Sequence, residues 1–244
     1  MTGPEILIET DASALAEVVA DQLVSTLSAL QSQGTTPSIV LTGGTIAEKI
    51  HEEVARRASD GRVDWSNVEI WWGDERYVPA GDPDRNEGQA RVAFLDGVGV
   101  DETKVHPMPA DDGTDLDAAA ARFAAEVGTR TFDLVMLGLG PDGHVASLFP
   151  GKPTLAETER TAVAEHDSPK PPPRRITMTF PVLNRGREVW FLVSGSGKAD
   201  AVARALTGSP VEQTPASGVH GSEQTLWMLD EGAASALPDE LRPS

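Results

Sequence analysis

The stretch FDLVMLGLGPDGHVASLFPG, residues 132–151, begins as a nearly continuous apolar run and ends in a turn rich in glycine and proline. A short apolar run bounded by turn residues is typical of a strand buried on both faces of a sheet. Asp142 and His144 follow that strand directly, after glycines that permit a sharp exit. A histidine accepts a proton near neutral pH because its pKa is about 6.5, so we expect it to take part in chemistry. The alternative is a structural histidine bonded to a neighbouring carbonyl.

Similar apolar runs alternate with helical patterns along the rest of the chain. The other apolar runs lie at residues 5–10, 38–44, 68–78, 104–109, 175–180, 188–198 and 225–234. The helical patterns lie at residues 12–30, 45–58, 86–95, 115–127 and 199–206. This alternation predicts an α/β fold with a mostly parallel sheet and helices on both faces, whose ligands bind at the carboxyl ends of the strands. We expect one domain over residues 1–244, with the proline-rich segment 165–175 as a surface loop.

Composition excludes several classes of partner. Acidic residues outnumber basic ones by 38 to 20, and the net charge is −18, so neither nucleic acid nor a membrane surface is an expected partner. No apolar stretch is long enough to span a membrane, the first residues lack signal-peptide features, and cysteine is absent. These features predict a cytoplasmic protein. No apolar stripe exceeds the needs of the core, so the oligomeric state is undefined and a monomer is the simpler expectation.

The turn VLTGGT, residues 40–45, is a candidate anion site. Gly43 and Gly44 let the backbone approach a ligand closely, and Thr45 is placed to cap the following helix. Backbone N–H groups at a helix N-terminus bind phosphate groups well. The pattern matches neither of the common glycine-rich nucleotide motifs, so a plain strand-to-helix turn is the alternative.

Charged side chains mark three further places beside predicted strands. In the stretch WWGDERYVP, residues 71–79, the charged residues Asp74, Glu75 and Arg76 follow the apolar run that contains the two tryptophans. Arg175 opens a strand, and Lys198 stands at the head of a helix, where a cation opposes the helix dipole. Each alone is compatible with a solvated surface charge. Together with the glycine turn and the histidine, they are expected to lie at strand ends of one sheet. This grouping predicts a pocket for a phosphorylated small molecule that undergoes proton transfer.

The same residues carry a family resemblance. The stretches LTGGT, WWGDERYVP, GLGPDGHVASLFPG, RITMTFPVLN and VSGSGKADAV occur in the order seen in 6-phosphogluconolactonases, over about residues 5–235. The resemblance implies a Rossmann-like fold related to glucosamine-6-phosphate deaminase. It also implies hydrolysis of 6-phospho-D-glucono-1,5-lactone to 6-phosphogluconate, the second step of the oxidative pentose phosphate pathway, without a metal or an organic cofactor.

The resemblance further implies a role for each motif residue. His144 matches the general base that draws a proton from the attacking water. Asp142 and Asp74 match acidic positions that orient His144 or the sugar hydroxyls, and Arg76 matches an arginine that stabilises the oxyanion. The positions expected around the phosphate are Gly43, Gly44, Thr45, Arg175 and Lys198.

Two departures from the family pattern alter these expectations. Thr42 precedes the glycine turn and Ile46 and Ala47 follow it, where the family often has serine and Ser-Thr-Pro. We therefore expect fewer hydroxyl contacts to the phosphate. Arg85 precedes Asn86, where the family commonly has serine, and we expect this arginine to face solvent.

Two rival functions use the same motifs. The deaminases that resemble this chain follow their Asp-Gly-His turn with AFNEP, whose glutamate assists ring opening. Here the corresponding stretch is ASLFPG, which has no carboxylate and so favours lactone hydrolysis. A non-catalytic sugar-phosphate sensor is the other rival, but such sensors usually carry an output module, and none is expected here.

Overall fold

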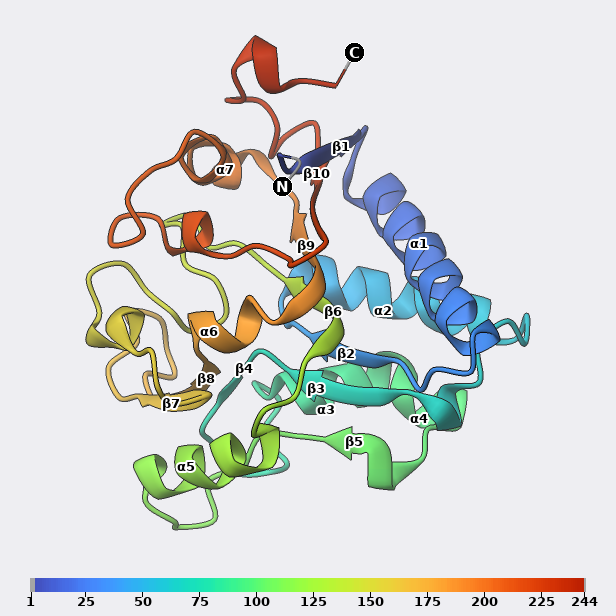
Figure 1. Ribbon diagram of the computed structural model, residues 1–244, viewed down its shortest axis with the longest axis vertical. Helices are drawn as coiled ribbons and strands as arrows, with labels where there is room; N and C mark the ends of the chain where they lie inside the picture. The colour runs from blue at the N-terminus through green and yellow to red at the C-terminus, as the bar shows by residue number, and fades with distance from the viewer. Residues whose placement is uncertain (1–2, 244) are drawn as a thin grey trace.

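Seven parallel strands form the main sheet of the computed structural model, which describes residues 3–243 (Figure 1). The ends of the predicted domain, residues 1–2 and 244, lie outside the described residues. The strand order is β1-β10-β9-β6-β2-β3-β5, and every neighbouring pair is parallel. The strands are β1 (Glu5–Glu9), β2 (Ser38–Leu41), β3 (Glu69–Trp72), β5 (Val105–His106), β6 (Phe132–Leu137), β9 (Gly186–Val193) and β10 (Gln224–Asp230).

Both faces of the main sheet are buried, which explains the apolar runs in its strands. Successive side chains of a strand point to opposite faces. Trp71 of β3 packs in one apolar cluster and Trp72 in the other, and both are fully buried. In β6, Val135 packs in the cluster of Trp71 and Met136 in the cluster of Trp72. Each large apolar side chain buried in this way stabilises the fold by about 1.5–3 kcal/mol.

Helices cover both faces, so the predicted α/β architecture is confirmed (Figure 1). The face of Trp72 carries α1 (Ala12–Ser32), α2 (Thr45–Ala58) and the π-helical turn Arg91–Leu95 between α3 (Asn86–Ala90) and α4 (Asp96–Val98). The face of Trp71 carries α5 (Leu116–Val127), α6 (Phe180–Leu183) and α7 (Ala199–Leu206). Among residues 3–243, no helix has the length and apolarity needed to cross a membrane.

A second, antiparallel sheet was not predicted from the sequence. It consists of β4 (Asp74–Arg76), β8 (Arg175–Met178) and β7 (Ala162–Glu165), in the order β4-β8-β7. Arg175 therefore opens a strand of this small sheet, and the expectation that all the motifs lie at strand ends of one sheet is wrong. The run 68–78 is also divided between two strands, β3 and β4.

Gly73 is the residue at which the chain passes from one sheet to the other. Its N–H donates to the Leu41 carbonyl of β2 at 3.0 Å, and its carbonyl accepts from the Met178 N–H of β8 at 2.8 Å. One residue is thus hydrogen-bonded to both sheets. This junction brings the small sheet to the carboxyl edge of the large one.

The strand order reverses between β2 and β6. From β2 the chain continues to β3 and β5 on one side, and from β6 it continues to β9 and β10 on the other. In open α/β sheets, ligands bind outside the carboxyl ends of the strands at such a reversal. The loops that leave β2 and β6 meet there, where the Gly138 N–H donates to Thr42 Oγ1 at 3.3 Å. The fold therefore places the glycine turn beside the histidine turn.

Glu75 fastens the start of α3 to the small sheet. Its side chain is 1% exposed, and its carboxylate accepts backbone N–H bonds from Arg76 at 2.8 Å, Asn86 at 2.8 Å and Glu87 at 2.9 Å. Asn86 and Glu87 begin α3, whose first N–H groups have no partner inside the helix. The carboxylate thus satisfies the helix end and holds it against β4.

Arg85 does not face solvent, so that expectation is wrong. It is 2% exposed, and its Nη2 donates to the Met108 carbonyl at 2.7 Å. The same nitrogen lies 3.8 Å from the Glu75 carboxylate. Burial raises the pKa of Glu75, while the charge of Arg85 and the backbone N–H bonds oppose that rise. Arg85 is therefore a buried counter-charge to the carboxylate that anchors α3.

We predict that Glu75→Ala lowers the free energy of unfolding by about 3 kcal/mol or more, because it removes the acceptor of three backbone hydrogen bonds and a counter-charge of buried Arg85. Urea denaturation followed by circular dichroism measures the change. The control is Glu52→Ala, an exposed position on α2, which is expected to change stability by no more than about 0.5 kcal/mol. A loss below about 1 kcal/mol for Glu75→Ala would contradict the anchoring role.

Candidate functional site

A cavity of about 120 Å³ opens where the strand order reverses. Its walls come from the loops after β2 and β6, from the small sheet, and from the proline-rich loop. Seven of the nine predicted site residues line it. They are Gly43, Gly44, Asp74, Arg76, His144, Arg175 and Lys198. Residues that are distant in the sequence thus meet in one cavity.

The other two predicted residues, Thr45 and Asp142, do not line this cavity. Thr45 is exposed and lines a neighbouring cavity of about 230 Å³, which shares Gly43 and Lys198 with the first. Gly44, not Thr45, is the N-cap of α2, and its φ of 102° lies in the region that glycine adopts freely. The predicted capping role of Thr45 is therefore wrong. Asp142 does not line the cavity itself but is hydrogen-bonded to His144, which does.

His144 is hydrogen-bonded to Asp142 and not to Asp74. His144 Nδ1 lies 2.5 Å from Asp142 Oδ1. Burial by itself raises the pKa of Asp142, but the hydrogen bond and the charge of His144 outweigh it and hold that pKa well below its usual range. An ionised carboxylate only accepts hydrogen bonds, so Nδ1 carries the hydrogen and Nε2 is left with a free lone pair. Asp74 Oδ2 instead accepts from Ser147 Oγ at 2.5 Å.

Glycine at position 140 makes room for this pair. A Cβ on Gly140 would collide with the His144 imidazole and with the Asp142 carboxylate. The Gly140 N–H also donates to the His144 carbonyl at 2.9 Å, which closes the turn. The Phe149 ring packs against the imidazole with its centroid 4.5 Å away. The turn therefore fixes the orientation of the His144 ring.

The surroundings of His144 favour its neutral form. Burial lowers the pKa of His144 below its ordinary value of 6.5, and the positive charge of Lys170 lowers it further. The hydrogen bond and charge of Asp142 and the charge of Asp74 raise it, but the net change is downward. Near pH 7 the imidazole is thus unprotonated and able to accept a proton from a water molecule.

Arg76 is held in the cavity by a neighbouring amide. Its Nη1 donates to Asn86 Oδ1, and Asn86 Nδ2 donates to the Asp74 backbone carbonyl at 2.9 Å. Arg76 Nε is buried and has no hydrogen-bond partner within residues 3–243. Asn86, which lines the cavity, was not predicted as a site residue. Its role depends on α3 being fastened to β4, a pairing with no local sequence signal.

Lys170 is the most important lining residue that the sequence analysis missed. It belongs to the proline-rich segment, which is predicted as a surface loop, yet its side chain lines the cavity. The only sequence signal was its place in KPPPRR, the longest basic cluster of the chain. A proline-rich loop outside any helix or strand gives no periodic pattern from which the direction of its side chains can be predicted.

The cavity has a surplus of positive charge. Arg76, Lys170, Arg175 and Lys198 line it together with one carboxylate, that of Asp74. Burial lowers the pKa of Lys170, Arg175 and Lys198, which shows that charge is held there against a desolvation cost. No group of three or more histidine, aspartate or glutamate side chains is arranged for a metal ion in the part of the chain that the structure describes. The arrangement suits a small anion.

The sequence is similar to known proteins over nearly its whole length. The family model of glucosamine-6-phosphate isomerases/6-phosphogluconolactonase matches residues 10–227. The chain is 44% identical to a 6-phosphogluconolactonase of Streptomyces coelicolor, over 98% of this chain and 97% of that protein. It is also 44% identical to a 6-phosphogluconolactonase of Mycobacterium tuberculosis, over 96% of this chain and 98% of that protein.

Solved structures show the same fold. A 6-phosphogluconolactonase from Trypanosoma brucei superposes with a TM-score of 0.84 at 25% identity, over 98% of this chain and all of that chain. A monomeric glucosamine-6-phosphate deaminase superposes with a TM-score of 0.81 at 21% identity, over 95% of this chain and 99% of that one, a likeness of fold alone. From the family match and the close relatives together, this chain belongs to the glucosamine-6-phosphate isomerase/6-phosphogluconolactonase family.

Proposed function

We propose that this protein is a carboxylic ester hydrolase that converts 6-phospho-D-glucono-1,5-lactone to 6-phospho-D-gluconate, the second step of the oxidative pentose phosphate pathway. The observation that carries the proposal is the His144–Asp142 pair, with a free Nε2, at the wall of a cavity lined by four cations. The pair supplies a base, and the cations suit a phosphorylated substrate. The relatives named 6-phosphogluconolactonase support this choice of substrate.

The proposed mechanism is attack by water on the lactone carbonyl. His144 Nε2 takes a proton from a water molecule as its oxygen bonds to the carbonyl carbon, and Asp142 stabilises the imidazolium that forms. Arg76 stabilises the negative charge that develops on the carbonyl oxygen. The bond from that carbon to the ring oxygen then breaks, and the ring oxygen receives the proton from His144. The carboxylic acid product releases one proton to solvent at neutral pH.

The substrate phosphate is proposed to lie at the turn that begins α2. Gly43 and Gly44 line the cavity there, and Gly44 is the N-cap of this 14-residue helix, whose first N–H groups have no partner inside the helix. Lys198 lines the same end of the cavity, and its ammonium group is held by a bond to the Leu139 carbonyl at 2.7 Å. Thr42 also lines the cavity; its Oγ1 accepts the Gly138 N–H and keeps its own O–H to donate, so one hydroxyl contact accompanies the backbone N–H groups in this proposal.

The segment after the histidine turn supports hydrolysis over deamination. Ser147 is buried and donates to Asp74, while Leu148 and Phe149 are buried in the apolar interior. None of these residues brings a carboxylate to the cavity. The acid that a deaminase would need for ring opening at this point is therefore missing, whereas attack by water needs only the base and an oxyanion partner.

The direct test is proton release from freshly prepared 6-phosphogluconolactone in a pH-stat, with the spontaneous rate subtracted. Glucosamine 6-phosphate, assayed for ammonia release, is the control substrate. We expect acceleration of the first reaction only. Ammonia from the control without lactone hydrolysis would establish the deaminase instead, and no turnover of either substrate would leave a binding protein.

We predict that His144→Ala lowers kcat for the lactone by about 10²–10⁴-fold, the usual contribution of a positioned general base. The fold is expected to persist, as circular dichroism would show, because the ring is at the wall of a cavity. The matched control is His220→Ala, an exposed histidine outside the cavity, which is expected to retain the wild-type rate. Undiminished turnover by His144→Ala would remove this residue from the mechanism.

We also predict the pH dependence of kcat/KM, which reports on the free enzyme. The base must be neutral, and the pKa of His144 lies below 6.5, so activity is expected to hold down to pH 6.5 and to fall only at lower pH. Asp142 raises the pKa of His144, so Asp142→Asn is expected to lower kcat and to move the acid limb to lower pH.

Because the substrate phosphate itself titrates near pH 6, the difference between wild type and Asp142→Asn isolates the group on the enzyme. Both profiles are measured with the same substrate, which contributes equally to each. An acid limb that moved to higher pH in Asp142→Asn would contradict the assignment of His144 as the titrating base.

A further inference from the structure

The ammonium group of Lys170 is free to meet a ligand in the cavity. Its side chain is half-buried and lines the same cavity as His144. Within residues 3–243 the ammonium group makes no hydrogen bond; its pKa is lowered by burial and by the charges of Arg175 and Arg76, and raised by the charge of Asp142. Lys198, by contrast, donates to the Leu139 carbonyl at 2.7 Å. Lys170 therefore holds an unused positive charge at the cavity wall.

Lys170 shares the cavity both with Lys198, which is proposed to contact the phosphate, and with His144, the proposed base. Burial lowers the pKa of Lys198, and the positive charge of Lys170 lowers it further. The same charge acts on the pKa of His144 and of Asp142. The charge of Lys170 thus acts at Lys198, in the same cavity that is proposed to hold the phosphate.

Arg175 is engaged elsewhere. It is 5% exposed, and its Nε donates to the Pro172 carbonyl at 3.2 Å. Its Nη2 donates to the Lys170 carbonyl at 3.1 Å and to the Pro171 carbonyl at 3.3 Å. Its Nη1 lies 3.9 Å from Asp74 Oδ2. A guanidinium group committed in this way does not have the free two-pronged face with which arginine binds phosphate.

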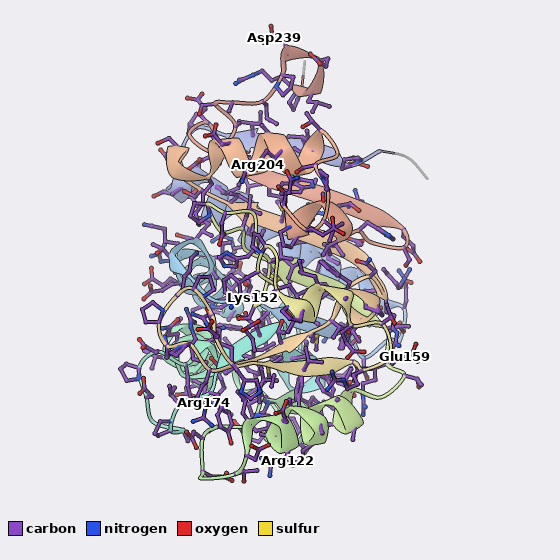
Figure 2. The ribbon with its side chains drawn as sticks, turned by 90° about the vertical axis from the view of Figure 1, so that its left-hand side faces the viewer. Arg122, Lys152, Glu159, Arg174, Arg204 and Asp239 are labelled. Atoms are coloured by element: carbon purple, nitrogen blue, oxygen red, sulfur yellow. The ribbon has the colours of Figure 1, made fainter. Side chains whose placement is uncertain are left out.

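The loop that Arg175 holds is closed by its own hydrogen bonds. The Ser168 N–H donates to the Pro173 carbonyl at 2.9 Å, and the Lys170 N–H donates to Ser168 Oγ at 3.1 Å. Prolines at 171–173 restrict φ at three successive residues. On the outer side, Lys152 (Figure 2) donates to Asp167 Oδ2 at 3.1 Å. The backbone at Lys170 is thus positioned before any ligand binds, which reduces the entropy cost of binding.

We propose that Lys170 binds the phosphate of the substrate, and that Arg175 is a positioning residue that holds the loop 168–173 which presents Lys170. The inference rests on the proposed function and replaces the phosphate contact that the sequence predicts for Arg175. A phosphate dianion needs more than one positive charge, and Lys198 supplies one. Lys170 supplies the second, as a compact ammonium group that needs no planar alignment.

The first test compares two substrates of Lys170→Gln at pH 7.5. For 6-phosphogluconolactone, kcat/KM is expected to fall roughly 10- to 100-fold, mainly through KM, as expected for one hydrogen bond to a charged group. For unphosphorylated glucono-1,5-lactone, kcat/KM is expected to stay within about twofold of wild type. Equal losses on both substrates would place Lys170 at the reacting carbonyl, and no loss on either would remove it from the site; both outcomes overturn the proposal.

The matched control is Lys152→Gln, which removes a lysine that contacts the same loop from outside the cavity. The ion pair between Lys152 and Asp167 is exposed at Asp167 and therefore stabilises the loop only slightly. We expect kcat/KM for either substrate to change by less than about twofold. A loss in Lys152→Gln equal to that in Lys170→Gln would mean that loop disturbance alone explains the result, and would contradict a phosphate contact.

The second test concerns Arg175→Lys, which keeps the charge but loses the hydrogen bonds to three carbonyls. Its kcat/KM is expected to fall as in Lys170→Gln for the phosphorylated lactone and to stay unchanged for the unphosphorylated one. The double variant, which carries both Lys170→Gln and Arg175→Lys, is expected to have the same kcat/KM as Lys170→Gln alone. Losses that multiply in the double variant would mean that Arg175 contacts the phosphate itself. Arg174→Lys is the control: this neighbour (Figure 2) pairs with Asp111 at 3.0 Å and lies outside the cavity.

Calorimetric titration with 6-phosphogluconate separates failure of this inference from failure of the proposed function. If wild type hydrolyses no lactone, the proposed function fails, but a dissociation constant raised roughly 10-fold or more by Lys170→Gln still supports the phosphate contact. If wild type is active and Lys170→Gln binds 6-phosphogluconate as tightly as wild type does, the phosphate contact is disproved while the hydrolase stands.

Discussion

The parallel pairing of β2 with β6 is the constraint on which the rest of the site depends. Only two residue pairs define its register, Ile39 with Leu134 and Val40 with Val135. From this pair the chain builds outward in opposite directions, so the connections after the two strands diverge and leave a crevice at their carboxyl ends. The glycine turn and the histidine turn leave the two strands at that crevice. The strand order alone therefore brings the two turns together.

The charge distribution has a physical cost that a bound anion would relieve. The chain carries a net charge of −18, yet four of its cations line one cavity. Burial and mutual repulsion both disfavour the charged forms there, and the lowered pKa values of Lys170, Arg175 and Lys198 reflect this. A phosphate dianion would offset that repulsion when it bound. Part of the affinity for the proposed substrate is therefore stored in the free protein as unfavourable electrostatic energy.

The parts of the fold that depend on local sequence could be predicted. Strand β6 and the turn that carries His144 are contiguous, so the apolar run and its glycines indicated both. The small sheet could not be predicted, because β4 has three residues and forms only by pairing with Arg175–Met178, about a hundred residues later. Arg85 was misplaced for the same reason. Its burial depends on Glu75 and Met108, whose proximity no local pattern records.

Site residues that directly follow a strand of the main sheet could be predicted from the sequence, whereas Lys170, which a distant loop brings to the cavity, was missed. Thr45 was assigned to a cap because threonine favours that position, but the positive φ at the end of the turn is adopted by Gly44. Lys170 was overlooked because prolines indicate a surface loop. In this loop the Arg175 guanidinium group replaces the hydrogen bonds that a strand or helix would make. A loop held by a buried side chain and by hydrogen bonds of its own can be ordered without any periodicity in its sequence.

The chemistry of the cavity requires a balance at His144 that no single neighbour provides. Asp142 and Asp74 raise the pKa of His144 and so favour the imidazolium, the form that cannot accept a proton. Burial and the charge of Lys170 lower that pKa and favour the neutral ring, which is then a weaker base. In the proposed complex, the phosphate offsets the charge of Lys170 and so removes one of the influences that lower the pKa of His144. Binding of the phosphate would then strengthen the base at the other end of the cavity, which favours proton transfer only when a phosphorylated substrate is in place.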